Sequence, residues 1–403
     1  MAYRAVVVAF LFAAFSSYGV ELKEKDLGVL LPIQSRYIIN VTGEPNLEKI
    51  FSKSWLRQVN EAFEETSIGS SLETENIPED WQLVSLRIVP CSPLGTYPHQ
   101  DIGELCWPEI RQVWQPILRD KKIRWNVKRP FYADDRAIHA LYDTSLLKGD
   151  VQLLQKIRNL LQSYHGQKSI DSELRVKFLE RRDIAVARFI KAVSELRQYA
   201  AGESSYSGFS YRPEMNGEKE EKNFILSLSQ FLSDWAPSAS LKAMTAFSLP
   251  EGRTPAHTDE WKFLSFRGEK GQLVQENITV KLLTEDETVI DIGKSEFVSM
   301  RRDDPAFYDI WYEADELQLK LMKQSLFLFE DDRHSLKDVI ADRRQTLVPN
   351  TSCGSCHKFN ELNFNLHNYS YLEDWSASVS PRTKKDIELD LSWLKSWLER
   401  KKN

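Results

Sequence analysis

The sequence predicts an α+β fold with a helix-rich N-terminal region, a small antiparallel sheet in the middle and a helical C-terminal segment. Apolar residues recur at helical spacing in long stretches before residue 200. Between residues 241 and 292 they alternate with polar residues in short runs, which is typical of strands. Near the chain end, Ser380 and Pro381 form the capping signal of a final helix.

Length and composition narrow the class of protein. A chain of 403 residues is too long to fold around one hydrophobic core of ordinary size, so we expect two or three domains. Charged residues make up 28% and hydrophobic residues 42%, which is the profile of a soluble globular protein. The formal net charge of −6 offers no basic field, so we expect no nucleic-acid partner.

The first residues resemble a secretory signal peptide. Arg4 precedes an apolar run from Ala5 to Phe15, and Ser17 and Gly19 place small residues before a cleavage point. We expect cleavage after Gly19, which leaves Val20 as the first residue of an exported, periplasmic or secreted protein. A membrane anchor is the weaker alternative because a span needs about 20 apolar residues. No later stretch is apolar enough to span a bilayer.

The N-terminal region contains both strand and helix signals. The apolar run Tyr37–Ile39 suggests a short strand, and Leu47–Phe63 carries apolar residues at helical spacing. Strands are predicted at Gln82–Val89, before Pro90, and at Ile123–Val127.

Helices then dominate up to about residue 235. We expect them at Asp150–Tyr164, with Asp150 as the cap, at Ser172–Tyr199 and at Asn223–Trp235. Between the last two, Ala201–Asn223 is rich in Gly and Ser and is predicted to be a linker or a long surface loop. The second helix also has a basic face, which we expect to be solvated: Arg181, Arg182, Arg188 and Arg197.

The middle of the chain predicts strands, and the end predicts helices. A turn at Gly268–Gly271 separates the second and third of four strands. These strands are Leu241–Leu249, Trp261–Phe266, Ile278–Leu282 and Thr288–Ile292. Helices follow at Ile310–Phe329 and after Pro381, where Trp393 and Trp397 are expected to pack inward. The buried stripe of that final helix is Ile387, Leu391, Leu394 and Leu398.

Four cysteines divide into two pairs. Cys91 and Cys106 lie at the ends of a stretch that contains Pro and Gly, and in an exported protein we expect them to form a disulfide. Closing this loop of about 15 residues adds about 3 kcal/mol by the chain-entropy relation. The alternative is two buried free thiols.

The other pair belongs to the run Cys353-Gly354-Ser355-Cys356-His357. This Cys-x-x-Cys-His spacing resembles the haem-attachment motif of the c-type cytochromes, over these five residues alone. The resemblance implies a covalent haem c, with Cys353 and Cys356 bonded to the two vinyl groups and His357 as the proximal iron ligand.

Three alternatives remain for this motif. Structural zinc needs four ligands, and no second Cys pair has this spacing. A thioredoxin-like dithiol opens a helix early in its domain, whereas only 47 residues of the 403 follow Cys356. An ordinary disulfide beside an incidental histidine is the third.

The motif's setting departs from that of a small cytochrome c, in which a Met ligand follows downstream. No Met follows His357, and the last is Met322. We favour His367 as the distal ligand, with an open sixth position as the alternative. Upstream candidates are Met244, Met300, Met322, His257 and His334.

A second constellation is His257, Asp259 and the later His334, whose pattern resembles the facial triad of non-haem iron oxygenases. A hydrogen-bonded loop explains the same residues and is favoured, since an exported protein lacks ready access to the oxo-acid cosubstrate that such oxygenases use.

Covalent haem attachment and N-glycosylation do not normally occur in the same secretory pathway, so the two expectations exclude each other. We favour export to a bacterial-type periplasm. The glycosylation sequons are Asn40, Asn277, Asn350 and Asn368.

Together these observations predict an exported monohaem electron-transfer protein with a redox partner protein that the sequence does not identify. An electron carrier is favoured over a catalyst. The alternative is a secreted, disulfide-stabilised binding or structural protein without a cofactor. The predicted organisation is a signal peptide (1–19), a mixed but mainly helical region (20–205), an α+β region with an antiparallel sheet (220–345) and a haem c-attachment segment (346–403).

Overall fold

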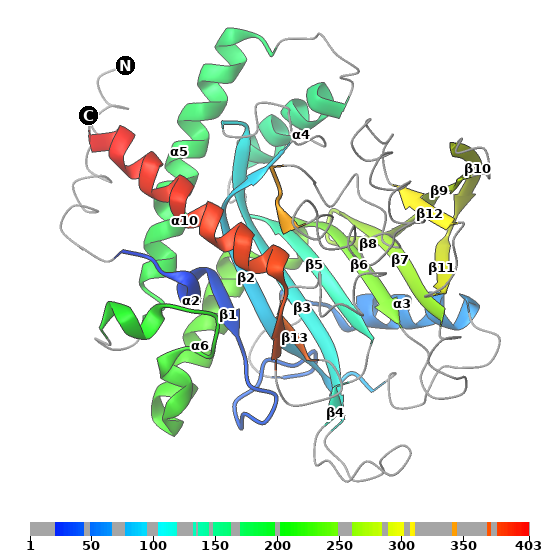
Figure 1. The fold of residues 1–403 in the computed structure, drawn as a ribbon, viewed down its shortest axis with the longest axis horizontal. Helices are drawn as coiled ribbons and strands as arrows, with labels where there is room; N and C mark the ends of the chain where they lie inside the picture. Colours follow the sequence, from blue (N-terminus) through cyan, green and yellow to red (C-terminus); the bar gives the residue numbers. More distant parts are fainter. Residues whose placement is uncertain are drawn as a thin grey trace, which may run out of the picture.

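The chain has an α+β fold built on a large antiparallel sheet (Figure 1). The computed structural model describes residues 21–43, 49–66, 77–94, 104–118, 132–133, 136–144, 148–162, 170–197, 202–248, 260–283, 289–301, 307–310, 341–344, 369–371 and 377–402. The strand order is β1-β2-β3-β5-β6-β7-β11, with β4 paired to β3 and β8 to β7. The strands are β1 Gly28–Leu30, β2 Trp81–Pro93, β3 Cys106–Leu118, β4 Tyr132–Ala133, β5 Ala137–Asp143, β6 Leu241–Ser248, β7 Glu260–Glu269, β8 Gln272–Glu276 and β11 Phe297–Arg301.

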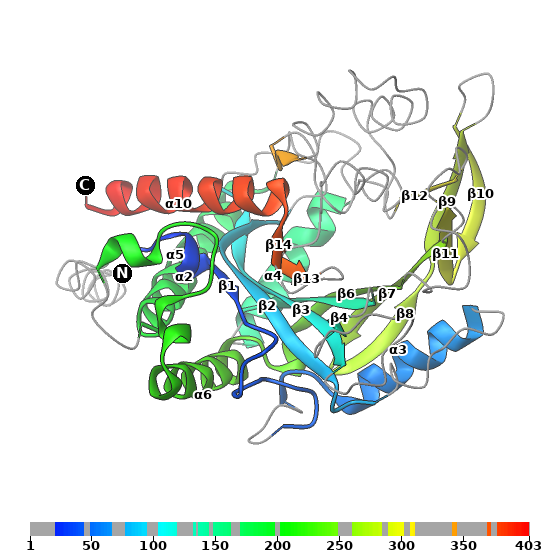
Figure 2. The same cartoon turned by 60° about the horizontal axis from the view of Figure 1, so that its bottom comes forward.

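Two smaller sheets accompany it. One has the order β10-β9-β12 and lies at the end of the molecule away from α10 (Figure 2). The other is the pair β13 and β14. Their strands are β9 Ile278–Leu283, β10 Val289–Ser295, β12 Phe307–Ile310, β13 Tyr369–Tyr371 and β14 Ala377–Val379.

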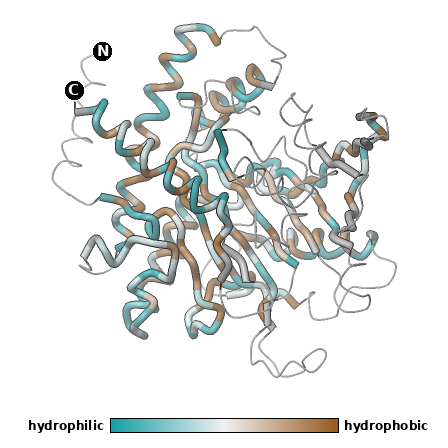
Figure 3. The backbone as a smooth tube through the Cα atoms, in the orientation of Figure 1, coloured by the Kyte–Doolittle hydropathy of each residue, from teal (hydrophilic) through white to brown (hydrophobic). Residues whose placement is uncertain are grey.

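Helices cover the large sheet on both sides. In Figure 2, α3 and α6 lie on one side of it and α10 lies on the other. The helices are α2 Glu24–Leu27, α3 Lys53–Thr66, α4 Lys148–Gln162, α5 Ser172–Ser194, α6 Glu218–Trp235 and α10 Pro381–Lys402, with short 3-10 turns at Glu203–Tyr206, Pro213–Asn216 and Ser238–Ser240. The principal hydrophobic core runs from Leu22 to Trp397, so both ends of the described chain contribute to it. Hydrophobic positions recur along the central strands (Figure 3).

The sheet joins strands that lie far apart in the sequence. Strand β3 was not predicted, because Pro108, Glu109 and Arg111 interrupt its apolar pattern. Together with β2 and β5 it extends the strands of the middle region, so the sheet is larger than the sequence suggested. The predicted turn is confirmed: Lys270 and Gly271 have φ values of 53° and 83°, as a two-residue hairpin connecting β7 to β8 requires.

Several other predictions from the sequence differ from the structure or are not tested by it. The expected solvated basic face of α5 is wrong for Arg182, which is buried and ion-paired with Asp183. Helix α6 begins at Glu218, so the charged run before residue 223 forms its first turns. Residues 37–39 form no strand, although the neighbouring Asn40 bridges to Gln82. The predicted strand at 123–127, the predicted helix beyond residue 310 and the predicted signal peptide lie outside the described residues.

Candidate functional site

The predicted haem residues Cys353, Cys356, His357 and His367 lie outside the described residues, as does His257. The structure does describe the chain on either side of the motif. Residues 341–344 precede it, and β13 follows it. These are the described segments that lie nearest to the Cys353–His357 motif in the sequence.

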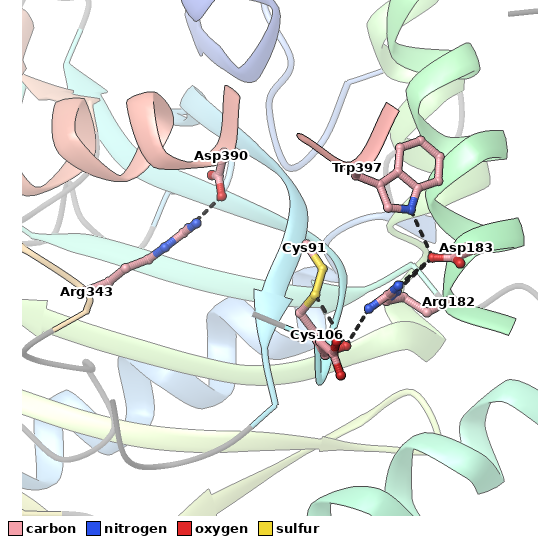
Figure 4. Close-up of a disulfide and its surroundings, with 8 residues drawn as sticks. Cys91, Cys106, Arg182, Asp183, Arg343, Asp390 and Trp397 are labelled. Atoms are coloured by element: carbon pink, nitrogen blue, oxygen red, sulfur yellow. Dashed lines mark hydrogen bonds and ion pairs between the residues drawn. A yellow bond between two sulfur atoms is a disulfide. The ribbon is translucent and has the colours of Figure 1, made fainter. Parts of the chain in front are cut away.

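Both flanking segments are held near the same part of the sheet. Before the motif, the guanidinium of Arg343 bonds Oδ1 of Asp390 on α10 at 2.6 Å (Figure 4). After it, β13 pairs with β14 and lies beside β2 and β3. The described segments before and after the motif therefore both contact the body of the protein, one at α10 and the other at β2 and β3.

Helix α10 follows directly from local sequence signals. Ser380 Oγ accepts a hydrogen bond from the Thr383 backbone N–H at 3.0 Å, which is the predicted N-cap. Of the predicted stripe, Ile387 and Leu394 are buried in the principal core, and Leu391 and Leu398 are partly buried against it. Trp397, which was expected to pack inward beside the stripe, is also buried. Trp393 stacks on Trp397 with ring centroids 6.1 Å apart, so both indoles pack as expected.

A buried ion-pair network joins α10 to β2. Arg87 bonds Asp386 at 2.8 Å and Asp390 at 2.7 Å, and all three side chains are at most 3% exposed. Arg382 also bonds Asp386, at 3.2 Å. Breaking one member of such a group leaves a buried charge uncompensated, which costs about 3 to 5 kcal/mol. The network therefore fixes the first turns of α10 on the sheet.

A second ion-pair group lies next to this network on the sheet. Arg87 on β2 lies directly opposite Arg111 on β3, and Arg111 bonds Glu109 at 2.6 Å. Lys242 on β6 bonds the same carboxylate at 3.0 Å. We call the two neighbouring groups together the charge cluster. Its members are Arg87, Glu109, Arg111, Lys242, Arg343, Arg382, Asp386 and Asp390.

The electrostatics keep the carboxylates of this cluster ionised. Burial alone raises the pKa of Asp386, but Arg382, Arg87 and Arg343 outweigh it and hold the pKa well below its usual range. Glu109 shows the same balance, with Lys242 and Arg111 opposing burial and lowering its pKa. The two carboxylates are therefore negatively charged throughout the physiological pH range.

His139 on β5 borders the cluster. Burial, helped by the positive charge of Arg111, lowers its pKa to about 4. Its ring packs edge-on against Phe247 at 5.3 Å between centroids. His139 is therefore neutral at pH 7 and adds no charge to the cluster.

The C-terminal half of α10 is fixed on α5. Asp183 accepts hydrogen bonds from Trp397 Nε1 at 2.9 Å and from Arg182 at 2.6 Å (Figure 4). It also pairs with Lys401 at 2.6 Å. Arg182 also donates to the Glu104 carbonyl, two residues before Cys106. Helix α10 is thus attached to the sheet at one end and to α5 at the other.

The predicted disulfide between Cys91 and Cys106 is confirmed. It joins the ends of β2 and β3 with a Cα–Cα distance of 4.9 Å. Because the sequence has four cysteines, Cys353 and Cys356 are the two left over. Their thiols and the adjacent imidazole are the donor set that haem c attachment needs, so the residues fit that group.

Sequence reasoning missed the charge cluster. The available signal was the pair Asp386 and Asp390, four residues apart on a predicted helix and next to the apolar stripe position Ile387. Carboxylates at buried positions require buried cations, but nothing local identifies Arg87 as the partner.

The described part of the chain contains no group of three or more His, Cys, Asp and Glu residues placed to hold a metal ion. Of the helices described, none has the length and apolar character that crossing a membrane demands. Comparisons with protein-family models, curated proteins and solved structures found no match for this chain.

Proposed function

We propose that this chain is an exported monohaem c-type protein that transfers electrons. The observation that carries the proposal is the Cys353–His357 motif, whose two thiols and imidazole have haem c spacing. Bound haem supplies the chemistry, the uptake and release of one electron at its iron. Cys353 and Cys356 hold it by thioether bonds, and His357 ligates the iron.

Two features of the fold support this proposal. The Cys91–Cys106 disulfide leaves Cys353 and Cys356 as the remaining cysteines, so both thiols are available to one porphyrin. The ion pair between Arg343 and Asp390 and the β13–β14 pair restrain the chain on both sides of the motif.

The experiment is expression with haem-maturation machinery, followed by a haem stain after denaturation. We expect a Soret band and a covalent stain that disappears in Cys353→Ser, Cys356→Ser and their double variant. The matched control is the Cys91→Ala/Cys106→Ala protein, which keeps the stain. Replacing His367 tests the distal ligand by a change in the low-spin absorption bands.

The second candidate is a secreted binding or structural protein with two disulfides. The Cys91–Cys106 bridge favours it, since one oxidised pair is already present. It predicts a colourless protein from the same cells, with Cys353 bonded to Cys356 in peptide mass maps. That result would contradict the haem proposal.

A further inference from the structure

Strand β10 is exposed along most of its length. It lies at the periphery of the molecule in both views (Figures 1 and 2). Residues 290–294 are all exposed, and they include two large apolar residues, Ile290 at 44% and Ile292 at 48%. A strand with one face on a core buries every second side chain, so β10 departs from the usual pattern.

One edge of β10 also has no neighbouring strand among those that the structure describes. The small sheet has the order β10-β9-β12, so β10 pairs with β9 on one side. Backbone N–H and C=O groups along a sheet edge are a template for pairing with another strand. Many proteins keep edge strands very short, whereas β10 spans seven residues. This edge is therefore a surface on which a further strand can pair.

A bulge in β10 restricts which strand fits. In the pairing with β9 the register shifts between Asp291 and Gly293, so Ile292 is the extra residue. Gly293 supplies the φ of 119°, and its N–H donates to Asp291 Oδ1 at 2.8 Å. Backbone hydrogen-bonding groups point alternately to the two sides of a strand, and the extra residue shifts this alternation. Asp291 and Lys294 therefore point the same way, since they pair with residues two apart on β9.

A second copy of β10 fits this edge in an antiparallel, two-fold arrangement. Residues opposite each other in such a pair must direct their hydrogen-bonding groups the same way. Asp291 and Lys294 meet this condition in spite of their odd separation, because of the bulge. Placing them opposite each other also pairs Ile290 with Ser295. Ile292 then lies opposite Gly293, where no side chain competes for space. All of residues 290–295 are thereby matched.

The charges select the same register. Asp291 and Lys294 are the charged residues of β10, and they have opposite signs. The two-fold axis brings them together twice, once at each end of the strand pair. Opposite charges in directly opposed positions favour pairing, and like charges disfavour it. A shift of register separates these charges, so the strand is complementary to itself in one register.

We propose that β10 is a self-association surface through which two copies of this chain form a two-fold symmetric dimer. The small sheets of the two copies then join into one continuous antiparallel sheet, and the exposed Ile290 and Ile292 gain neighbours across the new strand pair. One strand pair is small beside the interface of a stable complex. The dimer is therefore weak and forms in the micromolar to millimolar range, with or without bound haem.

Sedimentation velocity of the full-length purified protein over a concentration series tests this association. We expect the average mass to rise toward that of two chains. Lys294→Glu sets like charges opposite Asp291 in both places, so association should weaken about tenfold. The matched control is Lys395→Glu, the same charge change at an exposed position of α10, which should keep the parental association constant. A single-chain mass at every concentration, or equal association of Lys294→Glu and the parent, would overturn the inference.

A titration of two variants tests the register. Labelled Lys294→Glu protein is titrated with unlabelled Lys294→Glu or with unlabelled Asp291→Asn. The first combination opposes like charges twice, whereas the second restores one ion pair and leaves the other position neutral. The asparagine also keeps an acceptor for the Gly293 N–H, so the bulge is preserved. We expect the Asp291→Asn protein to bind about tenfold more tightly. Equal binding of the two unlabelled proteins contradicts the self-pairing of β10.

Discussion

Asp390 connects parts of the chain that are distant in sequence. Its carboxylate bonds Arg87 at 2.7 Å and Arg343 at 2.6 Å, while its own side chain is 1% exposed. Each of its oxygens accepts from a different arginine, so one carboxylate joins the sheet, α10 and the segment 341–344 that precedes the Cys353–His357 motif.

Replacing this carboxylate with an amide should therefore be costly. We expect Asp390→Asn to lower the free energy of unfolding by about 3 kcal/mol, because Arg87 and Arg343 lose a buried counter-charge. Urea unfolding at pH 7 measures the change. Glu388→Gln is the control on the exposed face of the same helix, and it should stay within about 0.5 kcal/mol of the parent. Equal effects of the two variants would show that Asp390 has no special role.

His139 predicts how stability depends on pH. Its folded pKa of about 4 lies below the ordinary value of 6.5, so the unfolded state binds more protons between these values. The contribution of His139 to the free energy of unfolding is complete above about pH 6.5 and is lost as the pH falls toward 4. Glu109 and Asp386 have lowered pKa values, so their contributions are present above the ordinary carboxyl pKa of about 4 and are lost only below it.

Measurements of unfolding free energy between pH 6.5 and pH 4 therefore test the contribution of His139. The charge of Arg111 acts on its ring, and Phe247 packs edge-on against that ring. We expect His139→Gln to reduce the slope of unfolding free energy against pH in this window, as measured by urea unfolding at several pH values. Parent and variant curves that stay parallel there would contradict the assignment.

At the scale of elements, the β2–β3 hairpin is held by its disulfide as well as by its ladder. Cys91 and Cys106 are 15 residues apart in sequence, which gives about 3 kcal/mol by the chain-entropy relation. We expect Cys91→Ala/Cys106→Ala to lose about this amount in urea unfolding under oxidising conditions. The same comparison under reducing conditions is the control, because the parent then loses its bridge and the difference disappears.

At the scale of the whole molecule, stability should be uneven. The core that contains α10, β2 and α5 is continuous, whereas the sheet β10-β9-β12 has a small separate core in which Ile278, Val280 and Val298 are buried. Ile290 and Ile292 of β10 are 44% and 48% exposed. We expect the amides of β9 and β10 to exchange with deuterium faster than those of β2 and β3. Similar protection in both sheets would contradict this division.

Local signals predicted several elements well. The Ser380 cap and the apolar stripe of α10 depend on residues three or four positions apart, so the final helix was predicted with its buried face. The hairpin turn before Gln272 likewise needs only two residues with positive φ. Strand β3 was missed because Pro108, Glu109 and Arg111 interrupt its apolar pattern. The burial of Arg182 was missed because it depends on distant contacts such as the Glu104 carbonyl, 78 residues away.

The sequence by itself determined the helix and strand periodicities, the α10 cap and the Cys353–His357 motif on which the proposed function depends. Only the tertiary structure decided which charges are buried together. Arg87 and Asp390 are 303 residues apart, and no local pattern links them. Burial removes water from both groups, so each charge must find its partner through the packing of the whole chain. For this reason only the folded structure identifies the members of the charge cluster.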